Sequence, residues 1–264
     1  MSHSTEHNSR PEQSATLFIA ASETDSNLYY ATRFIAPDPF IYLEVKGERL
    51  MVMSDLEVDR ARNQATVDRV LSYSELERRA KSQGVKDPGT IDVIHLVLQD
   101  AGLKDILVPP TFPFLHASRL QEMGYRLRTK RDPFYEQRVM KSDDEVRHIE
   151  AAQRATETAV AAAHQHLRRA EIRDNVLWLD GEILTSERVK KLINVALMEC
   201  DCVAQHTIVA GGEQACDPHD EGSGPLPAHR SIIFDVFPRP AETRDFPDMS
   251  RTVVRGTPSP ELTR

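Results

Sequence analysis

An aspartate inside an apolar run is the feature that most constrains what this 264-residue chain can fold into. Asp235 lies within residues 232–237, which read IIFDVF, and the β-branched and aromatic residues around it predict a strand. An ionised carboxylate that is buried without a partner costs on the order of several kcal/mol. The segment is therefore either an edge strand that turns Asp235 to solvent, or a strand that presents Asp235 to a cation.

A second aspartate, Asp248, opens the strand-like segment 249–254. The intervening residues are rich in proline and charge, so the two segments are expected to form a β-hairpin with a long connection. Because side chains alternate along a strand, Asp248 shares a face with Ser250 and Thr252. If that face coincides with the face of Asp235, two carboxylates meet across the ladder. Such a pair repels unless a cation lies between its members, and carboxylate oxygens suit divalent ions such as Mn, Co or Zn.

These segments resemble the metal-binding segments of the pita-bread metallohydrolases, which include methionine aminopeptidase, Xaa-Pro aminopeptidase, prolidase and creatinase. Residues 232–237 are similar to the family's first metal-aspartate segment, and residues 248–253 (DMSRTV) to its second. Upstream, the family places a substrate-site histidine between a glycine-containing turn and a Pro-Leu pair. The turn at 208–212 (IVAGG), His219, and the pair at 225–226 follow that layout.

The resemblance implies a dinuclear metallopeptidase that removes the N-terminal residue from peptides with proline at the second position. In the complete family site, two divalent metal ions (Mn, Co or Zn) are held by five side chains and share a bridging hydroxide that attacks the scissile carbonyl. Asp235 is expected to bind one ion through both oxygens, and Asp248 to bridge the two. His219 is expected to be the catalytic, substrate-binding histidine, and Thr252 to hydrogen-bond near Asp248.

The chain also departs from the family pattern. Residues 237–239 (FPR) replace the small residues that usually follow the first aspartate. The family's metal histidine and two metal glutamates lie farther along the chain and have no counterpart before Arg264. We therefore expect a family member truncated within its catalytic domain, with weak or no metal binding and no activity on its own. The alternatives are a non-catalytic pita-bread protein-interaction module and a creatinase-like C–N hydrolase.

Three regions are expected along the chain. Residues 1–15 are polar and lack an apolar signal core, so they predict a disordered tail. Residues 16–140 alternate between strand and helix signals, which predicts an α/β domain that resembles the N-terminal domain of creatinases and Xaa-Pro aminopeptidases. Residues 141–264 are expected to be the N-terminal half of an α+β pita-bread catalytic domain. A capping box at 142–145 (SDDE) predicts that this region opens with a helix that runs to about Arg169.

The remaining elements follow from apolar periodicity and from turn residues. An aromatic segment begins at Leu28, and Gly84 and Gly102 are expected just beyond the ends of two helices. Strands are expected at 17–21, 40–45, 49–53, 105–109 and 125–129, and helices at 56–63, 74–83, 91–101, 115–123 and from Thr185 or Ser186 to Met198.

The other histidines and one arginine have less specific expectations. His148, His164 and His166 lie on the helix that begins near residue 143 and are expected to face solvent. Arg251 is expected to be a structural ion-pair partner rather than a catalyst.

The N-terminus lacks an apolar signal core, which predicts a cytoplasmic protein. In that context the odd number of cysteines, three, argues against a disulfide framework. A zinc site from Cys200, Cys202, His206 and Cys216 is conceivable, but its spacing matches no common zinc module. Unremarkable thiols are the preferred interpretation.

Charge and hydropathy limit the classes of binding partner that are expected. The net charge is −8, with acidic and basic residues interspersed, so neither nucleic acid nor an anionic membrane is expected as a partner. No segment approaches the roughly 18 apolar residues of a membrane-spanning helix. A peptide substrate is the expected ligand, and a homodimer is a further expectation.

Overall fold

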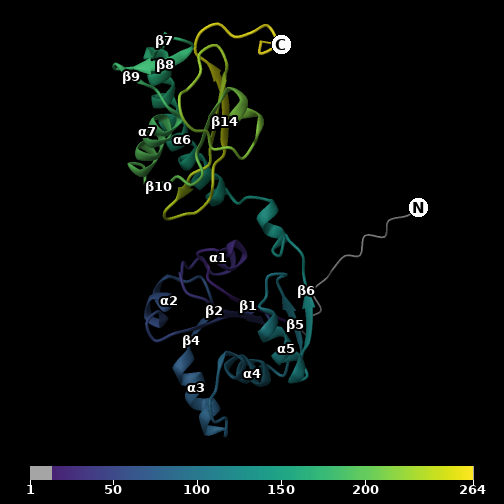
Figure 1. The fold of residues 1–264 in the computed structure, drawn as a ribbon. Helices are drawn as coiled ribbons and strands as arrows, with labels where there is room; N and C mark the ends of the chain where they lie inside the picture. Colours follow the sequence, from purple (N-terminus) through teal and green to yellow (C-terminus); the bar gives the residue numbers. More distant parts are fainter. Residues whose placement is uncertain (1–13, 264) are drawn as a thin grey trace, which may run out of the picture. The chain divides into compact units, whose positions relative to one another are not determined.

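The computed structural model describes residues 14–263 (Figure 1). The chain divides into two compact units, the first ending at Met140 and the second beginning at Lys141. The first unit is α/β and the second combines helices with small antiparallel sheets, in agreement with the expected fold class.

The N-terminal tail expected at residues 1–15 extends too far into the chain. Residues 1–13 of that tail lie outside the described residues, whereas Ser14 and Ala15 already belong to the first strand. Ala15 is fully buried, so the folded part of the chain begins before residue 16.

The first unit is built around a six-stranded sheet with the order β4-β3-β2-β1-β5-β6. The β1–β2 and β2–β3 pairs are antiparallel, and the β1–β5, β3–β4 and β5–β6 pairs are parallel. The strands are β1 (Ser14–Ala20), β2 (Phe40–Val45), β3 (Glu48–Met53), β4 (Arg69–Ser72), β5 (Asp105–Val108) and β6 (Arg126–Thr129).

Both faces of this sheet are covered. Leu17 packs into a cluster with Leu43 and Ile94, whereas its neighbour Phe18 packs into a second cluster with Tyr42 on the other face. The helices are α1 (Ser26–Thr32), α2 (Val58–Gln64), α3 (Tyr73–Ser82), α4 (Thr90–Ala101) and α5 (Phe114–Glu122), followed by the 3-10 turn η1 (Glu136–Val139).

The second unit opens with the helix that the capping box predicts, α6 (Asp143–Arg169). The Ser142 hydroxyl accepts a hydrogen bond from the Glu145 amide, and the Glu145 carboxylate accepts one from the Ser142 amide. A second helix, α7 (Ser186–Met198), begins after Thr185, whose hydroxyl accepts a hydrogen bond from the amide of Arg188. Both helices pack on one face of a three-stranded sheet and close a single apolar core.

That sheet has the order β11-β12-β14 and consists of β11 (Ile208–Gly211), β12 (Ser231–Val236) and β14 (Met249–Val254). The predicted hairpin is confirmed, since β12 and β14 pair antiparallel. The smaller elements were not expected from the sequence: β7 (Glu171–Arg173), β8 (Val176–Leu179), β9 (Glu182–Ile183), β10 (Cys202–Val203), η2 (Gly212–Cys216) and β13 (Arg239–Pro240).

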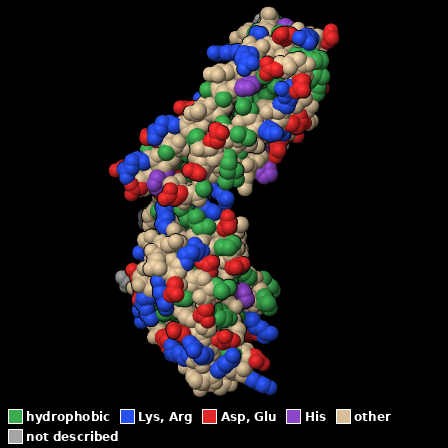
Figure 2. All heavy atoms as spheres, turned by 90° about the vertical axis from the view of Figure 1, so that its left-hand side faces the viewer, with side chains coloured by type: hydrophobic (Ala, Val, Ile, Leu, Met, Phe, Trp, Pro, Cys, Tyr) green, Lys and Arg blue, Asp and Glu red, His purple; other side chains and the backbone are tan. Residues whose placement is uncertain are grey.

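Acidic and basic side chains are interspersed over the face of the molecule shown in Figure 2, which carries no extended surface of one sign. Among the helices of residues 14–263, none is both long enough and apolar enough to cross a membrane.

Candidate functional site

Asp235 lies on the side of β12 that faces away from the helices. Ile232, Phe234 and Val236 are fully buried and contribute to the core, whereas Ile233 and Asp235 are only partly buried. This alternation is the period of a strand with one covered face. Asp235 therefore keeps access to water, and its charge does not require a buried partner.

The direct neighbour of Asp235 across the ladder is Ser250 of β14. The Ser250 hydroxyl donates a hydrogen bond of 2.5 Å to Oδ1 of Asp235. Sequence reasoning placed a second carboxylate opposite Asp235, and it did not single out Ser250. The hydroxyl orients the Asp235 carboxylate and leaves its other oxygen available to a further ligand.

Asp248 lies immediately before β14 and is exposed. Met249, the first residue of the strand, is buried opposite Val236, and Ser250 is exposed. The alternation places Asp248 on the side of Ser250, and hence diagonal to Asp235 rather than opposite it. Diagonal positions on a ladder have Cα atoms about 7–8 Å apart, which two carboxylate side chains can bridge through a shared ligand.

Thr252 occupies the next position on the same side of β14, opposite Ile233. Its side chain is exposed. The hydroxyl that contacts a candidate metal aspartate is that of Ser250, two residues nearer the start of the strand. Arg251 projects to the other face, opposite Phe234, and donates to the carbonyl of Ser250. Arg251 was expected to be an ion-pair partner, but within residues 14–263 it forms no ion pair with a carboxylate.

His219 lies in an exposed loop after η2, where its amide donates to Oδ1 of Asp217 at 3.0 Å. The loop continues to Glu221, whose carbonyl accepts a hydrogen bond from the amide of Val209 in β11. Since Ile208 pairs with Asp235, the strand β11 separates this loop from β12. Two strand spacings amount to about 10 Å, which is the separation expected between Glu221 of this loop and β12. No hydrogen bond joins His219 to either aspartate among the described residues.

Two of the α6 histidines that were expected to face solvent, His148 and His164, make contacts with other elements. His148 Nδ1 lies 2.9 Å from Oδ2 of Asp245, a residue of the connection between β12 and β14. The ring of His164 packs edge-on against Phe234 with centroids 5.2 Å apart, and its Nε2 is buried without a hydrogen-bond partner among the described residues. Burial, with smaller contributions from Arg168 and Arg251, lowers the pKa of His164.

The three cysteines are free thiols. Cys202 is buried, which raises its pKa, whereas Cys200 and Cys216 are exposed. Over residues 14–263, no group of three or more His, Cys, Asp or Glu side chains is arranged to hold a metal ion. The zinc alternative therefore has no geometric support in the described part of the chain, and the candidate site at β12 and β14 offers two carboxylates. Carboxylate oxygens are suitable ligands for a hard divalent cation, but two carboxylates alone bind such a cation weakly.

Comparison with known proteins agrees with this arrangement. Residues 147–264 match the model of Metallopeptidase family M24. No curated protein matches the chain at a significant level. Similar solved structures include a prolidase from Pyrococcus furiosus, with a TM-score of 0.69 and 16% identity over 94% of this chain and 64% of the prolidase.

Two further structures are similar to both units. An X-Pro aminopeptidase from Thermotoga maritima has a TM-score of 0.71 and 20% identity, over 95% of this chain and 65% of its own. A Xaa-Pro dipeptidase from Bacillus anthracis has a TM-score of 0.72 and 15% identity, over 94% and 62%. The chain thus spans less than two thirds of the length of these proteins. The predicted resemblance is confirmed: the chain has part of the fold of the pita-bread peptidases, and its second unit matches the model of Metallopeptidase family M24.

Proposed function

We propose that this chain contributes to a dinuclear metallo-aminopeptidase that removes the N-terminal residue from peptides with proline at the second position. The observation that supports the proposal is that Asp235 lies on the open face of the β12–β14 ladder, and that Asp248 comes two residues before Ser250, the ladder partner of Asp235. That ladder lies in the unit that matches an M24 peptidase. The solved structures named above are, by their names, prolidases, X-Pro aminopeptidases and Xaa-Pro dipeptidases, which supports a substrate with proline.

In this proposal each residue has a distinct role. Asp235 and Asp248 hold divalent cations through carboxylate oxygens, with Mn, Co or Zn as candidates. The hydrogen bond from Ser250 fixes the orientation of the Asp235 carboxylate, and Thr252 lies on the same side of the ladder. When bound, the cations supply Lewis-acid activation of a water molecule and of the scissile carbonyl. His219 contacts the peptide and stabilises the developing negative charge on the carbonyl oxygen.

We propose further that the 264-residue polypeptide itself does not hydrolyse peptides. The candidate site offers two carboxylates, and no group of three or more His, Cys, Asp or Glu side chains among residues 14–263 is arranged to hold a metal ion. Two carboxylates cannot hold a pair of cations in catalytic geometry. The assay is release of the first residue from a Xaa-Pro peptide in the presence of Mn or Co. Robust turnover that Asp235→Asn abolishes would show that the ligand set is complete after all.

The substrate class is tested by binding rather than by turnover. An isotopically labelled chain is titrated with a Xaa-Pro tripeptide and with the matching Xaa-Ala tripeptide in the presence of Zn, and the signals of His219, Ile233 and Ser250 are followed by NMR. We expect the proline peptide to shift these signals at lower concentration. Equal responses to the two peptides would remove the proline preference and favour a creatinase-like hydrolase or a general interaction module.

Location and assembly stay proposals as well. Three free thiols are compatible with a reducing compartment, and we propose a cytoplasmic protein. A homodimer is also proposed, to be checked by the mass measured in solution.

A further inference from the structure

The loop that carries His219 is held tightly against the outer edge of β11. The amide of Val209 donates to the carbonyl of Glu221 at 3.1 Å, so the loop extends the sheet by one short pairing. The next residue, Gly222, has a positive φ of 77°, and a Cβ there would lie 2.0 Å from the Val209 carbonyl oxygen. Only glycine allows the loop to approach β11 this closely.

Helix α7 reaches the same loop from the other side. Lys190 donates from Nζ to the carbonyl of Gly222 at 2.9 Å. Glu187 accepts from the amide of Gly224, with its two carboxylate oxygens at 3.0 and 3.3 Å. Residues three apart on a helix share a face, so one face of α7 satisfies both a carbonyl and an amide of the loop.

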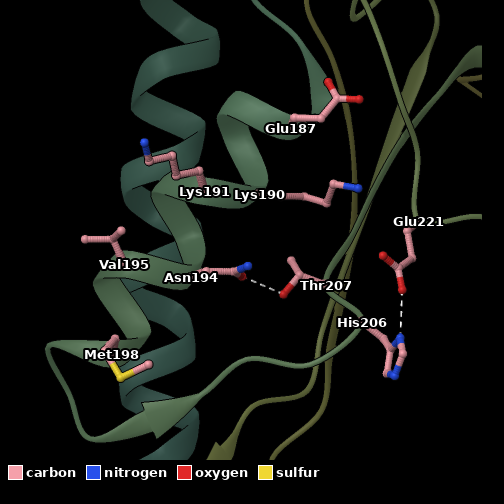
Figure 3. Close-up of a pocket in the computed structure, with 9 residues that line it drawn as sticks. All are labelled: Glu187, Lys190, Lys191, Asn194, Val195, Met198, His206, Thr207 and Glu221. Atoms are coloured by element: carbon pink, nitrogen blue, oxygen red, sulfur yellow. Dashed lines mark hydrogen bonds and ion pairs between the residues drawn. The ribbon is translucent and has the colours of Figure 1, made fainter.

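A third attachment comes from the residues that lead into β11. His206 Nδ1 lies 2.7 Å from Oε1 of Glu221, and Thr207 donates to Oδ1 of Asn194 on α7 at 2.8 Å. Figure 3 shows both contacts, with Lys190 and Glu187 on the same side of the helix. These residues line a groove of about 530 Å³ between α7 and the loop. Most of the polar side chains of the groove are bonded to protein groups, which favours an attachment role over a ligand site.

Helix α7 is itself a fixed reference. Val189, Ile193 and Leu197 are at most 1% exposed and pack in the core with Phe234 of β12. The loop is therefore fixed to the helix and to the sheet at once. The strand next to β11 carries Asp235, so these attachments set the distance from His219 to the candidate metal ligands.

We infer that Lys190 and Glu187 of α7, together with the His206–Glu221 pair, are positioning residues for His219. Lys190 and Glu187 act on the loop backbone from α7, whereas Asp235 lies on the face of β12 that points away from the helices. The inference rests on the proposed function for one point, the role of His219 in binding the peptide. The attachments of the loop do not depend on that role, because they are contacts within the fold.

The experiment compares Lys190→Met with the conservative Lys190→Arg in the full 264-residue chain. Lys191→Met is the matched control, because Lys191 is the next residue of α7, is exposed, and has no hydrogen bond or ion pair among residues 14–263. Amide hydrogen exchange is measured at Val209, Gly222 and Gly224, and the imidazole signals of His219 are recorded by NMR. We expect Lys190→Met to speed exchange at these amides about tenfold and to shift the His219 signals.

The same variant should leave exchange in the core of α7 and β12 unchanged, and Lys190→Arg should restore the His219 signals. Glu187→Gln, which keeps an acceptor for Gly224, should have a smaller effect than Glu187→Leu. Unaltered His219 signals in Lys190→Met, or faster exchange spread evenly over the second unit, would overturn the inference. A failure of metal binding at Asp235 would count against the proposed function and leave this result standing.

Discussion

The two units bury their sheets in different ways. In the first unit, adjacent residues of β1 such as Leu17 and Phe18 enter different apolar clusters, so the sheet is covered on both faces. In the second unit, Phe234 of β12 is fully buried, whereas Ile233 and Asp235 on the other face stay partly exposed. A covered face stabilises the fold, and an open face leaves carboxylates free to bind. The candidate site lies where the second unit leaves its sheet open.

The largest expected effect is independent unfolding of the two units. We expect residues 14–140 to keep their fold when separated, because their sheet is covered on both faces, and residues 141–264 to be less stable alone. Val139 and Met140 are 62% and 79% exposed, so limited proteolysis should cut near Met140 and leave a resistant N-terminal fragment. Equal resistance of both units to the protease would contradict the expected difference in their stability.

Adjacent residues of β12 test the two faces directly. Phe234→Ala should cost about 3–5 kcal/mol of unfolding free energy, because it opens a cavity beside His164 in the core. Ile233→Ala, one residue away on the open face, should cost about 1 kcal/mol or less. Urea unfolding followed by the fluorescence of Trp178, the single tryptophan of the chain, reports on the second unit. Similar costs for the two variants would mean that the open face is covered.

The sequence predicted the covered parts of both units better than the open part. The capping box at Ser142 and the end of α4 just before Gly102 were predicted, because both depend on residues close together in the chain. The pairing of β12 with β14 was predicted as well. The register of this pairing was not predicted. It depends on the conformation of the long connection, and a shift of two positions would keep the same side chains on the same face. Ser250 rather than Asp248 therefore came to lie opposite Asp235.

Other features had no reliable local signal. The strands β7 to β9 are two to four residues long, too short for an apolar alternation to be recognised. His164 lies close to the apolar side of α6, and only the position of Phe234 across the core shows that its ring is partly buried. The attachments of the His219 loop join residues 15 to 37 positions apart, which no periodicity records.

A smaller effect is expected from the glycines of the loop. Gly222→Ala should destabilise the second unit by about 2 kcal/mol, because the new Cβ meets the Val209 carbonyl oxygen and φ is positive. Gly224→Ala is the matched control: its φ of 70° is also positive, but no atom lies within 4 Å of the new Cβ. Its cost should be about 1 kcal/mol, and the difference between the variants isolates the contact with β11. Equal costs in urea unfolding would show that the loop is loosely held.

The pH dependence of stability should reflect His164. Burial lowers its pKa in the folded chain, whereas in the unfolded chain the pKa is about 6.5. The unfolded state binds the proton more readily, so the contribution of His164 to stability is present above about pH 6.5 and is lost as the pH falls below it. His164→Phe should flatten the dependence of the melting temperature between about pH 7.5 and 5. His166→Gln, on the same helix, is the control and should keep the slope.

The account depends most on the claim that Asp235 and Asp248 act together on a cation. The direct measurement is a Mn titration of the 264-residue chain, followed by the electron paramagnetic resonance signal of free Mn. We expect weak binding, with Kd of about 10⁻⁴–10⁻³ M, weakened at least about tenfold by Asp235→Asn and by Asp248→Asn. Asp174→Asn, at an exposed turn of the same unit, should change nothing. Binding that survives both amidations, or no binding by the unaltered chain at millimolar Mn, would contradict the claim.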